Sequence, residues 1–376
     1  MSKSAAYLRS EDGAYDAADS TKDYGMNHLA LLFNFIKLFV LLLPRLMVDF
    51  FHAYIWAPKK SIRGQVALVT GGANGFGKAL SIRLAKEGCS IAIADIDMVS
   101  AQKTAAELRQ HGFRTEPFKA DVSDPHSVHQ LRLDVENKLG PVDILVNNAG
   151  LLTTFALSDA STEDVRKICD VNLMSHLWMV REFKDGMVER SRGHIVGISS
   201  ILGFMHASKA TCYCVTKFAV RGLMKCLDDE FYQLGLEKKV VATGVYPIFM
   251  TTRQSLIDLV IKVGGLPVFL APEHVADATV NGILKNRTEI IVGTPIVRQF
   301  LKIIELVPIS FLHVLSEACV NAANSRAAAV YPNPNRLPVD LAPHKLDTIQ
   351  CNFNMQKQQQ QQQQRQGKRR FSATNT

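Results

Sequence analysis

The residues best suited to chemistry in this chain are a tyrosine and a lysine four positions apart, Tyr213 and Lys217. A phenol has an ordinary pKa of about 10, so it is a poor base at neutral pH unless a nearby cation stabilises the phenolate. If the chain is helical from Tyr213 onward, both side chains lie on one face and the Lys217 ammonium can supply that cation. Ser200 precedes them and carries a hydroxyl that could bind a substrate oxygen. These three residues predict proton abstraction from an alcohol.

A glycine-rich segment far ahead of these residues predicts a site for a dinucleotide. It follows a short apolar run at 66–69 and precedes a helix-like stretch. Glycines between a strand and a helix let the backbone approach a pyrophosphate closely and direct the helix N-terminus toward its negative charge. The residues that we expect to contact the cofactor here are Gly71, Asn74, Gly75, Phe76 and Gly77.

The next apolar run, 91–94, ends at Asp95, and this acid predicts which dinucleotide binds. A carboxylate at the end of the second strand can accept hydrogen bonds from ribose hydroxyls, whereas it repels a 2′-phosphate. Asn74 is neutral, and the glycine-rich turn contains no arginine or lysine that would attract the extra phosphate. We therefore expect NAD as the cofactor rather than NADP, and with it oxidation of the alcohol as the favoured direction.

The elements that must position these residues are recognisable from continuous apolar runs separated by helix-like stretches. Such runs are typical of parallel strands that are buried on both faces. Repeated alternation of strand and helix predicts an α/β fold, a Rossmann-type doubly wound parallel sheet with right-handed connections, over residues 62–295. The runs are 66–69, 91–94, 144–146, 195–198, 240–245 and 290–292.

Both ends of the chain differ from this middle. Residues 1–27 are polar and residues 332–376 contain a glutamine run, so we expect a disordered leader and a disordered tail. Residues 28–57 form a hydrophobic segment that we expect to associate with a membrane as an N-terminal helix. Residues 296–331 form an apolar C-terminal helical extension. The extension could contact a membrane, pack on the core or pack on a second subunit.

The hydrophobic segment is long enough to cross a bilayer, but polar residues and a proline interrupt it. Three arrangements stay open: a tilted span, a hairpin bent at Pro44 within one leaflet, and a helix in the interface. The alternative is an apolar helix that covers the protein's own core. The acidic leader and the lack of a small-residue cleavage site argue against a signal peptide. Lys59, Lys60 and Arg63 follow the segment, which predicts that the main domain faces the cytosol.

Composition argues against several other classes of protein. The formal net charge is +8, but basic residues near the C-terminus contribute half of it, and neither an aromatic-and-basic stripe nor zinc-finger spacing is present. We therefore expect no nucleic-acid partner. Seven cysteines without a C-x-x-C pair indicate reduced thiols, and we expect no metal site. Cys212 and Cys214, which flank Tyr213, are interpreted as packing residues.

The order of these motifs along the chain resembles one protein family. The glycine-rich turn is followed by Asp121-Val122, Asn147-Asn148-Ala149-Gly150, Asn172, Ser200, Tyr213 and Lys217. Over residues 62–295 this order resembles that of the short-chain dehydrogenases/reductases. Within that family, Asp95 and the apolar segments at both ends resemble the membrane-bound retinol dehydrogenases and the lipid-droplet hydroxysteroid 17-beta dehydrogenases. The narrower resemblance implies a location at the endoplasmic reticulum membrane or the lipid droplet, and the family implies a homodimer.

The resemblance implies a role for each matching residue. Asp121 would bind the adenine amino group with Val122 lining the adenine pocket. Asn172 would hold a water that connects Lys217 to solvent, and Lys217 would also bind the nicotinamide ribose. The implied catalytic set is Asn172, Ser200, Tyr213 and Lys217. The implied cofactor contacts, besides the glycine-rich turn and Asp95, are Asp121, Val122, Asn148, Ala149, Gly150, Tyr213, Lys217, Pro247, Ile248 and Thr252.

One residue departs from the family's pattern. After the sixth strand the family usually has Pro-Gly, whereas here Pro247 is followed by Ile248. A β-branched residue adopts a positive φ only at a cost in energy, so catalysis requires that a negative φ suffices at Ile248. We expect Thr252 to contact the pyrophosphate or the nicotinamide carboxamide.

The substrate that we expect is a lipophilic alcohol or carbonyl. Between residues 252 and 272 the chain is rich in leucine, isoleucine and valine around Gly264-Gly265, as a lid over a substrate pocket would be. Ordinary core packing is the alternative. Such a lid beside a membrane would admit retinol, a steroid or a fatty alcohol. Two other functions stay open, a membrane or lipid-droplet scaffold with weak turnover and an NADPH-linked carbonyl reductase.

Overall fold

The computed structural model describes residues 58–152, 157–207, 210–251 and 269–308, together with short pieces between 32 and 47 and between 310 and 314. The leader, most of the hydrophobic segment, residues 252–268 of the predicted lid and the glutamine-rich tail lie outside the described residues. The chain divides into two compact units, Met1–Pro58 and Lys59–Thr376, and the sheet belongs to the second.

Apart from Pro58, the first unit is described only by short pieces between residues 32 and 47. The described residues there are helical, and their apolar side chains, among them Leu32, Phe33 and Phe39, are exposed. Among the residues that the structure describes, no helix combines the length and the apolar character that crossing a bilayer requires. Association of this segment with a membrane therefore stays a prediction.

Seven parallel strands form one sheet, in the order β3-β2-β1-β4-β5-β6-β7. The chain builds one half outward from β1 to β3, returns to pair β4 with the other side of β1, and continues outward to β7. This is the doubly wound Rossmann-type sheet that the apolar runs predict. The strands are β1 (Val66–Thr70), β2 (Ser90–Asp95), β3 (Thr115–Lys119), β4 (Ile144–Asn147), β5 (Gly193–Ile198), β6 (Val240–Pro247) and β7 (Glu289–Val292).

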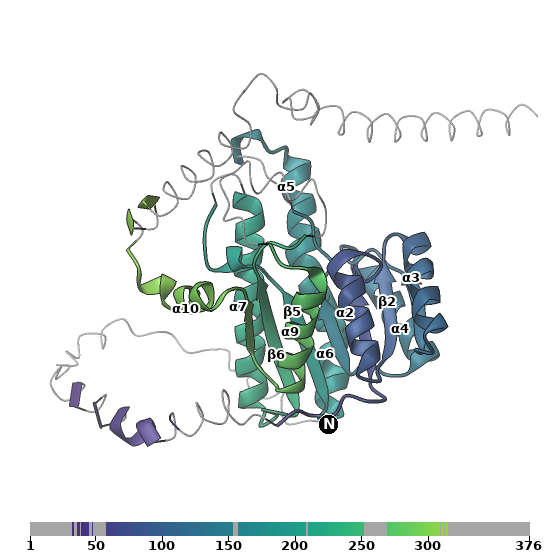
Figure 1. Cartoon of the computed structure of the whole chain (residues 1–376), viewed down its shortest axis with the longest axis horizontal. Helices are drawn as coiled ribbons and strands as arrows, with labels where there is room; N and C mark the ends of the chain where they lie inside the picture. The colour runs from purple at the N-terminus through teal and green to yellow at the C-terminus, as the bar shows by residue number, and fades with distance from the viewer. Residues whose placement is uncertain are drawn as a thin grey trace, which may run out of the picture. The chain divides into compact units, whose positions relative to one another are not determined.

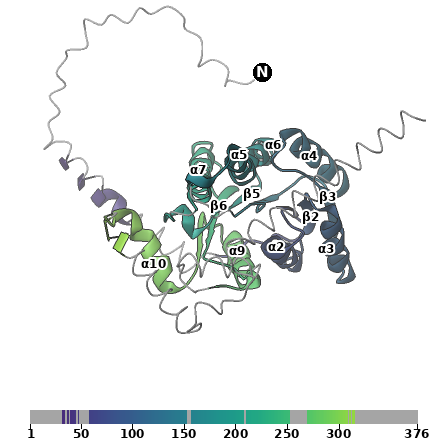
Figure 2. The same ribbon diagram turned by 90° about the horizontal axis from the view of Figure 1, so that it is seen from above.

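Helices cover both faces of this sheet (Figures 1 and 2). One layer contains α2 (Gly75–Lys86), α3 (Met98–Gln110) and α9 (Pro272–Leu284). The other layer contains α4 (Pro125–Leu139), α5 (Thr162–Cys169), α6 (Ser175–Glu189) and α7 (Thr211–Gln233). A π-helix, η2 (Asp170–Met174), joins α5 to α6, and a short 3-10 helix, η1 (Leu157–Asp159), precedes α5.

The two apolar cores explain why the strand sequences are continuously hydrophobic. On β1, Val69 packs in the core under α2, α3 and α9, whereas its neighbour Leu68 packs in the core under α4, α6 and α7. Successive side chains of a strand point to opposite faces, so a strand that is covered on both faces needs apolar residues at every position. Burial of this area, worth roughly 25 cal/mol per Å² of apolar surface, is the main force that holds the three layers together.

Strand β3 is the element that the apolar runs did not predict. Its residues Glu116, Pro117 and Lys119 are partly or fully exposed, and only Thr115 and Phe118 are buried. β3 is an edge strand that pairs with β2 alone. A proline is tolerated in an edge strand because one side of that strand needs no N–H donor. A search for continuous apolar runs therefore misses it.

Capping residues fix where several helices begin. The side chain of Asp97 accepts a hydrogen bond from the N–H of Ser100 at 3.1 Å, and that of Ser161 accepts one from the N–H of Asp164 at 3.0 Å. Such caps satisfy N–H groups that have no partner within the helix. Helices α4, α9 and α10 (Pro295–Ile303) each begin with a proline, whose fixed φ suits the first helical turn.

A third apolar cluster joins the described part of the C-terminal extension to the domain. Leu301 of α10 and Ile304 of the 3-10 helix η4 (Ile304–Leu306) are buried in it together with Phe204, Tyr246 and Ile248. The opposite side of the extension carries exposed apolar residues, including Ile296 and Leu306. One face of α10 is therefore part of the core of the sheet domain.

Candidate active site

Tyr213 and Lys217 lie in the first turns of α7, as neighbours on one face of the helix. The Nζ atom of Lys217 is 5.5 Å from the centroid of the Tyr213 ring. The same Nζ donates a hydrogen bond of 2.9 Å to the carbonyl oxygen of Ile198, the last residue of β5. Lys217 is buried and Tyr213 is half-buried. The phenol and the ammonium therefore meet at the carboxyl edge of the sheet, as their spacing predicts.

Ser200 joins this pair from the segment after β5. It begins the short 3-10 helix η3 (Ile201–Gly203), and its hydroxyl oxygen accepts a hydrogen bond from the N–H of Leu202 at 3.2 Å. A hydrogen bond between the Ser200 and Tyr213 side chains lowers the pKa of the phenol. The neighbouring Ser199 hydroxyl instead donates to the carbonyl oxygen of Lys217 at 2.8 Å inside the core. Of the two adjacent serines, Ser200 is the one that meets Tyr213.

Burial shifts both titratable groups of the site away from their charged forms. It raises the pKa of Tyr213 to about 12, although the Ser200 hydrogen bond acts in the opposite direction. It lowers the pKa of Lys217 to about 8. Our expectation that the lysine makes this phenol acidic is therefore wrong for the protein alone, because the loss of hydration on burial outweighs the Ser200 hydrogen bond. The phenol is protonated at neutral pH unless a further positive charge approaches it.

Asn172 lies beside these residues in the π-helix η2 and is fully buried. Its amide oxygen accepts from the N–H of Leu151 at 2.7 Å, and its amide nitrogen donates to the Leu151 carbonyl at 2.8 Å. A Cβ placed on Gly150 would lie 3.4 Å from Oδ1 of Asn172 and 3.7 Å from Nζ of Lys217. Asn172 thus holds the chain that follows Gly150 close to Lys217. π-Helical turns inside α-helices are frequent at functional sites, and the sequence carried no signal for this one.

The glycine-rich turn between β1 and α2 is closely packed. Gly71 and Gly75 have φ of +60° and +53°, in the left-handed region that glycine adopts readily. A Cβ on Gly77 would overlap the carbonyl oxygen of Gly71, so no larger residue fits there without a shift of the turn. Asn148 holds the turn from the side, since its Nδ2 donates to the carbonyls of Thr70 and Gly71 at 2.9 and 3.1 Å.

The N-terminus of α2 is open to an anion. Asn74 is its N-cap but makes no side-chain capping bond, and the first turn contains no acidic residue. Asn74 and Gly75 are exposed, whereas Phe76 is buried in the core. The unpaired N–H groups and the dipole of a helix N-terminus attract a phosphate. Backbone packed this tightly at a helix start therefore fits the pyrophosphate of a dinucleotide.

Asp95 ends β2 beside this turn. Its carboxylate oxygens accept hydrogen bonds from the backbone N–H of Ala73 and of Asp97, each at 3.1 Å. The acid is half-buried, and the Ala73 contact places its charge against the glycine-rich turn. Asp121, by contrast, is exposed and accepts from the N–H and hydroxyl of Ser123 at 3.0 and 2.6 Å. Val122 is buried.

Thr70 has a role that the sequence did not reveal. Its hydroxyl oxygen accepts hydrogen bonds from the N–H groups of Asn148 and Ala149 at 2.9 and 3.1 Å. It also lies 3.3 Å from the carbonyl oxygen of Val146, to which it can donate. One hydroxyl at the end of β1 therefore connects the glycine-rich turn to the Asn148-Ala149-Gly150 segment after β4. A single threonine at a strand end carries no pattern by which it could be recognised beforehand.

Ile248 does not strain the backbone at the place where the family usually has glycine. It has no positive φ, its N–H donates to the carbonyl of Val292 at 3.0 Å, and its side chain is buried in the third apolar cluster. Pro247 before it is the last residue of β6. Thr252 lies outside the described residues. The residues on either side of the predicted lid are joined, since the N–H of Thr251 donates to the carbonyl of Leu270 at 3.0 Å.

Cys212 and Cys214, on either side of Tyr213, are buried and free. Burial raises the pKa of the Cys214 thiol, which makes it a poor nucleophile. Within the described ranges, no cluster of acidic, histidine and cysteine side chains is arranged to hold a metal ion. These observations fit the interpretation of both cysteines as packing residues.

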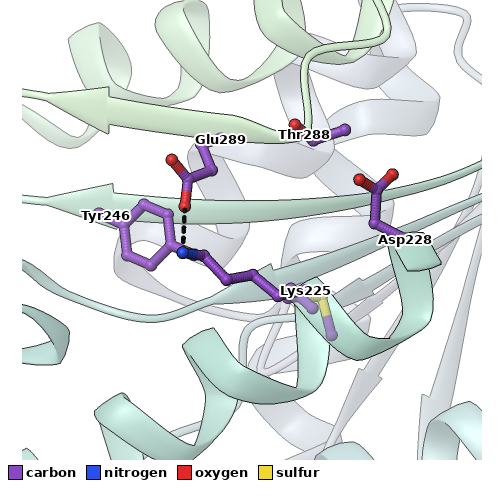
Figure 3. Close-up of a pocket in the computed structure, with 6 residues that line it drawn as sticks. Lys225, Asp228, Tyr246, Thr288 and Glu289 are labelled. Atoms are coloured by element: carbon purple, nitrogen blue, oxygen red, sulfur yellow. Dashed lines mark ion pairs between the residues drawn. The ribbon is translucent and has the colours of Figure 1, made fainter. Parts of the chain in front are cut away.

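A pocket of about 210 Å³ lies elsewhere, between α7, β6 and β7 (Figure 3). The Lys225 ammonium and the Glu289 carboxylate face each other across it at 3.8 Å, an exposed pair of small energetic value. None of the predicted site residues lines it. The lining residues are Met224, Lys225, Asp228, Tyr246, Thr288 and Glu289. Ser200, Tyr213 and Lys217 therefore lie outside this pocket.

Comparison with known families identifies the chain at this point. Residues 65–256, which contain the glycine-rich turn and the serine, tyrosine and lysine, match the family model described as short chain dehydrogenase. The protein is a short-chain dehydrogenase. Among curated proteins, this short-chain dehydrogenase is 32% identical over 281 residues to estradiol 17-beta-dehydrogenase 11 of Mus musculus. The aligned region covers 73% of this chain and 92% of that protein.

Two further comparisons extend this result. 17-beta-Hydroxysteroid dehydrogenase 13 of Mus musculus is 30% identical over 263 residues, covering 69% of this chain and 85% of that protein. Among solved structures, a short chain dehydrogenase/reductase from Burkholderia phymatum in complex with NAD is similar with a TM-score of 0.59. It is 25% identical, over 66% of this chain and 96% of that one. The short-chain dehydrogenase is therefore related to hydroxysteroid dehydrogenases in sequence and to an NAD complex in fold.

Proposed function

We propose that this short-chain dehydrogenase oxidises a lipophilic alcohol to its carbonyl with NAD. The observation that carries the proposal is the meeting of Ser200, Tyr213 and Lys217 at the carboxyl end of β5, on the sheet edge that also holds the glycine-rich turn. Ligands of doubly wound folds bind at this edge, where the strand order reverses. Bound NAD would supply the hydride acceptor and a positively charged nicotinamide.

The chain's own residues would move the proton. Ser200 would hold the substrate oxygen by its hydroxyl, and Tyr213 would take the hydroxyl proton as general base. A phenol whose pKa burial raises to about 12 needs positive charge nearby to act at neutral pH. Lys217, whose pKa is about 8, is still mostly charged at neutral pH and supplies part of it. The oxidised nicotinamide would supply the rest.

The residues around the glycine-rich turn support NAD in particular. Gly71, Gly75 and Gly77 would let the backbone and the N-terminus of α2 bind the pyrophosphate. The Asp95 carboxylate, held against the turn by Ala73, would bind ribose hydroxyls and repel the 2′-phosphate of NADP. We assign the adenine end to Asp121 and Val122 and the nicotinamide end to Pro247, Ile248 and Thr252. Asn172 would complete the proton path from Lys217.

The surroundings of Tyr213 support a lipophilic substrate. Its ring packs against the third apolar cluster, which includes Ile201, Phe204 and Ile248. Met205 and Phe249 also pack against this cluster and are only partly buried. An apolar surface beside the reacting groups binds the hydrocarbon part of a substrate and excludes water. Since the curated relatives are named as estradiol and hydroxysteroid dehydrogenases, we propose a steroid first, then retinol or a fatty alcohol.

Activity of the purified full chain tests the proposal. We expect NAD-dependent turnover of at least one member of a panel of steroid, retinoid and fatty alcohols, and weaker binding of NADP. Tyr213→Phe removes the proton acceptor and should lower kcat/KM by about 10²-fold or more, because general-base catalysis contributes about 10²–10⁴-fold. NAD binding by Tyr213→Phe, followed by fluorescence, controls for folding. Wild-type turnover in this variant would refute the assignment of the base.

One observation favours a second candidate, reduction of a carbonyl. The protein alone keeps Tyr213 protonated, with a pKa of about 12, and a protonated phenol is a proton donor. In that direction Tyr213 would give its proton to the carbonyl oxygen. Asp95 argues against the NADPH that would drive such a reaction. Comparing the two directions with both cofactors in the same experiment separates the candidates.

We also propose where the enzyme works. The exposed apolar residues Leu32, Phe33 and Phe39 support attachment of the 28–57 segment to the endoplasmic reticulum membrane or a lipid droplet, with the catalytic domain facing the cytosol. A lipophilic substrate dissolved in that surface would reach the enzyme there. Homodimer formation remains part of the proposal on the family resemblance alone.

A further inference from the structure

Two side chains in the core beneath the active site have no hydrogen-bond partner. Asn147 ends β4 and is 2% exposed, and His176, in the first turn of α6, is 1% exposed. Neither polar atom of the amide and neither ring nitrogen has a partner within the described part of the chain. Buried polar groups in folded proteins are almost always paired, with other protein groups or with an ordered water. Four such atoms in two neighbouring elements call for a common explanation.

The packing of α6 on β5 places His176 at the level of the catalytic lysine. A Cβ on Gly193, the first residue of β5, would fall 2.6 Å from the Met187 side chain near the end of α6. The helix between two parallel strands runs antiparallel to them. Eleven helical residues back from Met187 to His176 rise about 16 Å, and five strand residues from Gly193 to Ile198 cover about the same length. His176 therefore lies level with Ile198, whose carbonyl accepts from Lys217.

Asn147 reaches the same place from β4. It pairs in register with Gly197, the residue before Ile198. Leu145, two residues earlier on β4, is buried in the same core as Met179, one turn after His176. Residues two apart on a strand share a face, so the amide of Asn147 faces α6. Asn147 therefore lies at about the level of the Ile198 carbonyl that accepts from Lys217, as His176 does.

The charge of Lys217 acts on His176. Burial and then the positive charge of Lys217 lower the pKa of the imidazole to about 3, so the ring is neutral at physiological pH. A neutral imidazole offers one N–H donor and one acceptor nitrogen, and an amide offers both kinds as well. The Lys217 ammonium has three N–H donors, of which Ile198 takes one.

We propose that Asn147 and His176 bind a buried water that accepts a hydrogen bond from the Lys217 ammonium. This water is distinct from the one assigned to Asn172, which would lead to solvent. It hydrates the charged form of a lysine that burial otherwise drives toward neutrality. Asn147 and His176 are then positioning residues, acting on Tyr213 through Lys217, and this role rests on the proposed function.

The pH dependence of turnover tests the role. His176→Leu should remove the water and favour neutral Lys217. Because a charged Lys217 lowers the pKa of the phenol, its neutralisation should move the rising limb of kcat/KM for alcohol oxidation up by about one pH unit. Turnover near pH 7 should fall about tenfold. His176→Gln keeps a hydrogen-bond donor and an acceptor. This variant should therefore restore most of the turnover near pH 7 and return the rising limb of kcat/KM close to its wild-type pH. Identical pH profiles in the wild type and His176→Leu would overturn the proposal.

His194→Leu is the matched control. His194 is as buried as His176 and lies near the start of β5, at the other end of the strand from Ile198. Its two ring nitrogens have partners in Lys60 and Thr243. Its replacement should lower stability without moving the pH profile. If His194→Leu moves the profile as far as His176→Leu, the effect reports destabilisation and the proposal fails. If His176→Leu does not fold, Asn147→Leu takes its place.

Two measurements without cofactor separate this inference from the proposed function. The pKa of Lys217, followed by the ¹³Cε chemical shift in lysine-labelled protein, should fall in His176→Leu even if no alcohol is turned over. A high-resolution crystal structure should show water density between Asn147, His176 and Lys217. An unchanged Lys217 pKa, or a direct bond from the amide to the imidazole with no water, would overturn the proposal whatever the activity.

Discussion

Gly77 is the residue of the glycine-rich turn that tolerates the least change. Its missing Cβ would overlap the Gly71 carbonyl oxygen and lie 2.7 Å from Nδ2 of Asn148. Gly77→Ala must therefore shift the turn away from the position in which its backbone can bind a pyrophosphate. We expect NAD affinity to fall roughly tenfold or more, since overpacking of this kind costs about 1–3 kcal/mol. Equilibrium binding followed by nucleotide fluorescence measures it.

Gly222 provides the comparison for that substitution. It lies within α7, and a Cβ there meets nothing within 4 Å. Gly222→Ala should leave NAD affinity unchanged and stabilise the protein by about 0.5–1 kcal/mol, because alanine favours the helix. Equal losses of NAD affinity in both variants would mean that the tight contact at Gly77 has no bearing on the cofactor.

The spacing of residues along the sequence predicted some of the site residues but gave no indication of others. Four positions on one helix bring Tyr213 to Lys217, because helical geometry alone fixes that distance. Thr70 and His176 stand alone in the sequence, and their surroundings exist only once β1, β4 and α6 are packed. The pKa of Tyr213 was expected in the wrong direction for the same reason. Loss of hydration depends on packing that the sequence does not display.

At the level of elements, burial on both faces decided what could be predicted. Strands β1, β2, β4, β5 and β6 are buried at nearly every position, so their apolar runs were visible, and β7 was visible through Ile290 and Val292. The edge strand β3 was missed because polar residues and a proline are acceptable where a strand has one neighbour. The π-helix at Asn172 was not predicted, because no pattern of residue types in the sequence marks it.

Helix α10 yields a test of whether the C-terminal extension belongs to the catalytic domain. Leu301 is 1% exposed in the cluster that also holds Ile248, on the nicotinamide side of our proposal. Leu301→Ala should lower the free energy of unfolding by about 2–4 kcal/mol through loss of burial and the cavity left behind. Ile296 on the same helix is 82% exposed, and Ile296→Ala should change it by less than about 0.5 kcal/mol. Urea unfolding compares them, and similar values would show that α10 does not pack on the domain in solution.

Across the whole molecule, a chain of polar contacts joins the segment that leads into β1 to the edge of the sheet opposite the active site. Nζ of Lys60 donates to Nδ1 of His194 at 2.9 Å, and Nε2 of His194 donates to the Thr243 hydroxyl at 2.6 Å. That hydroxyl donates to the carbonyl of Arg287 at 2.6 Å. The same edge therefore anchors the residues that follow the hydrophobic segment.

Burial lowers the pKa of Lys60 from 10.5 to about 8, and this makes stability depend on pH. Between these values the unfolded chain binds the proton that the folded protein has released, so the free energy of unfolding rises with pH. The burial penalty is fully present below about pH 8 and is relieved by about pH 10.5, a difference of roughly 3 kcal/mol. Lys217 contributes in the same direction, so only a difference between variants isolates Lys60.

Lys60→Met should therefore flatten the rise in unfolding free energy between about pH 8 and pH 10, measured by urea unfolding at constant ionic strength. The variant leaves Nδ1 of His194 without its donor, but that loss is constant over this range because the pKa of His194 lies well below it. Lys59→Met serves as the control, since Lys59 is exposed and donates to the amide oxygen of Asn281. The rise of unfolding free energy with pH could instead have the same slope in Lys60→Met as in Lys59→Met. That result would show that Lys60 keeps its ordinary pKa in the folded protein and contacts His194 as a hydrated surface lysine.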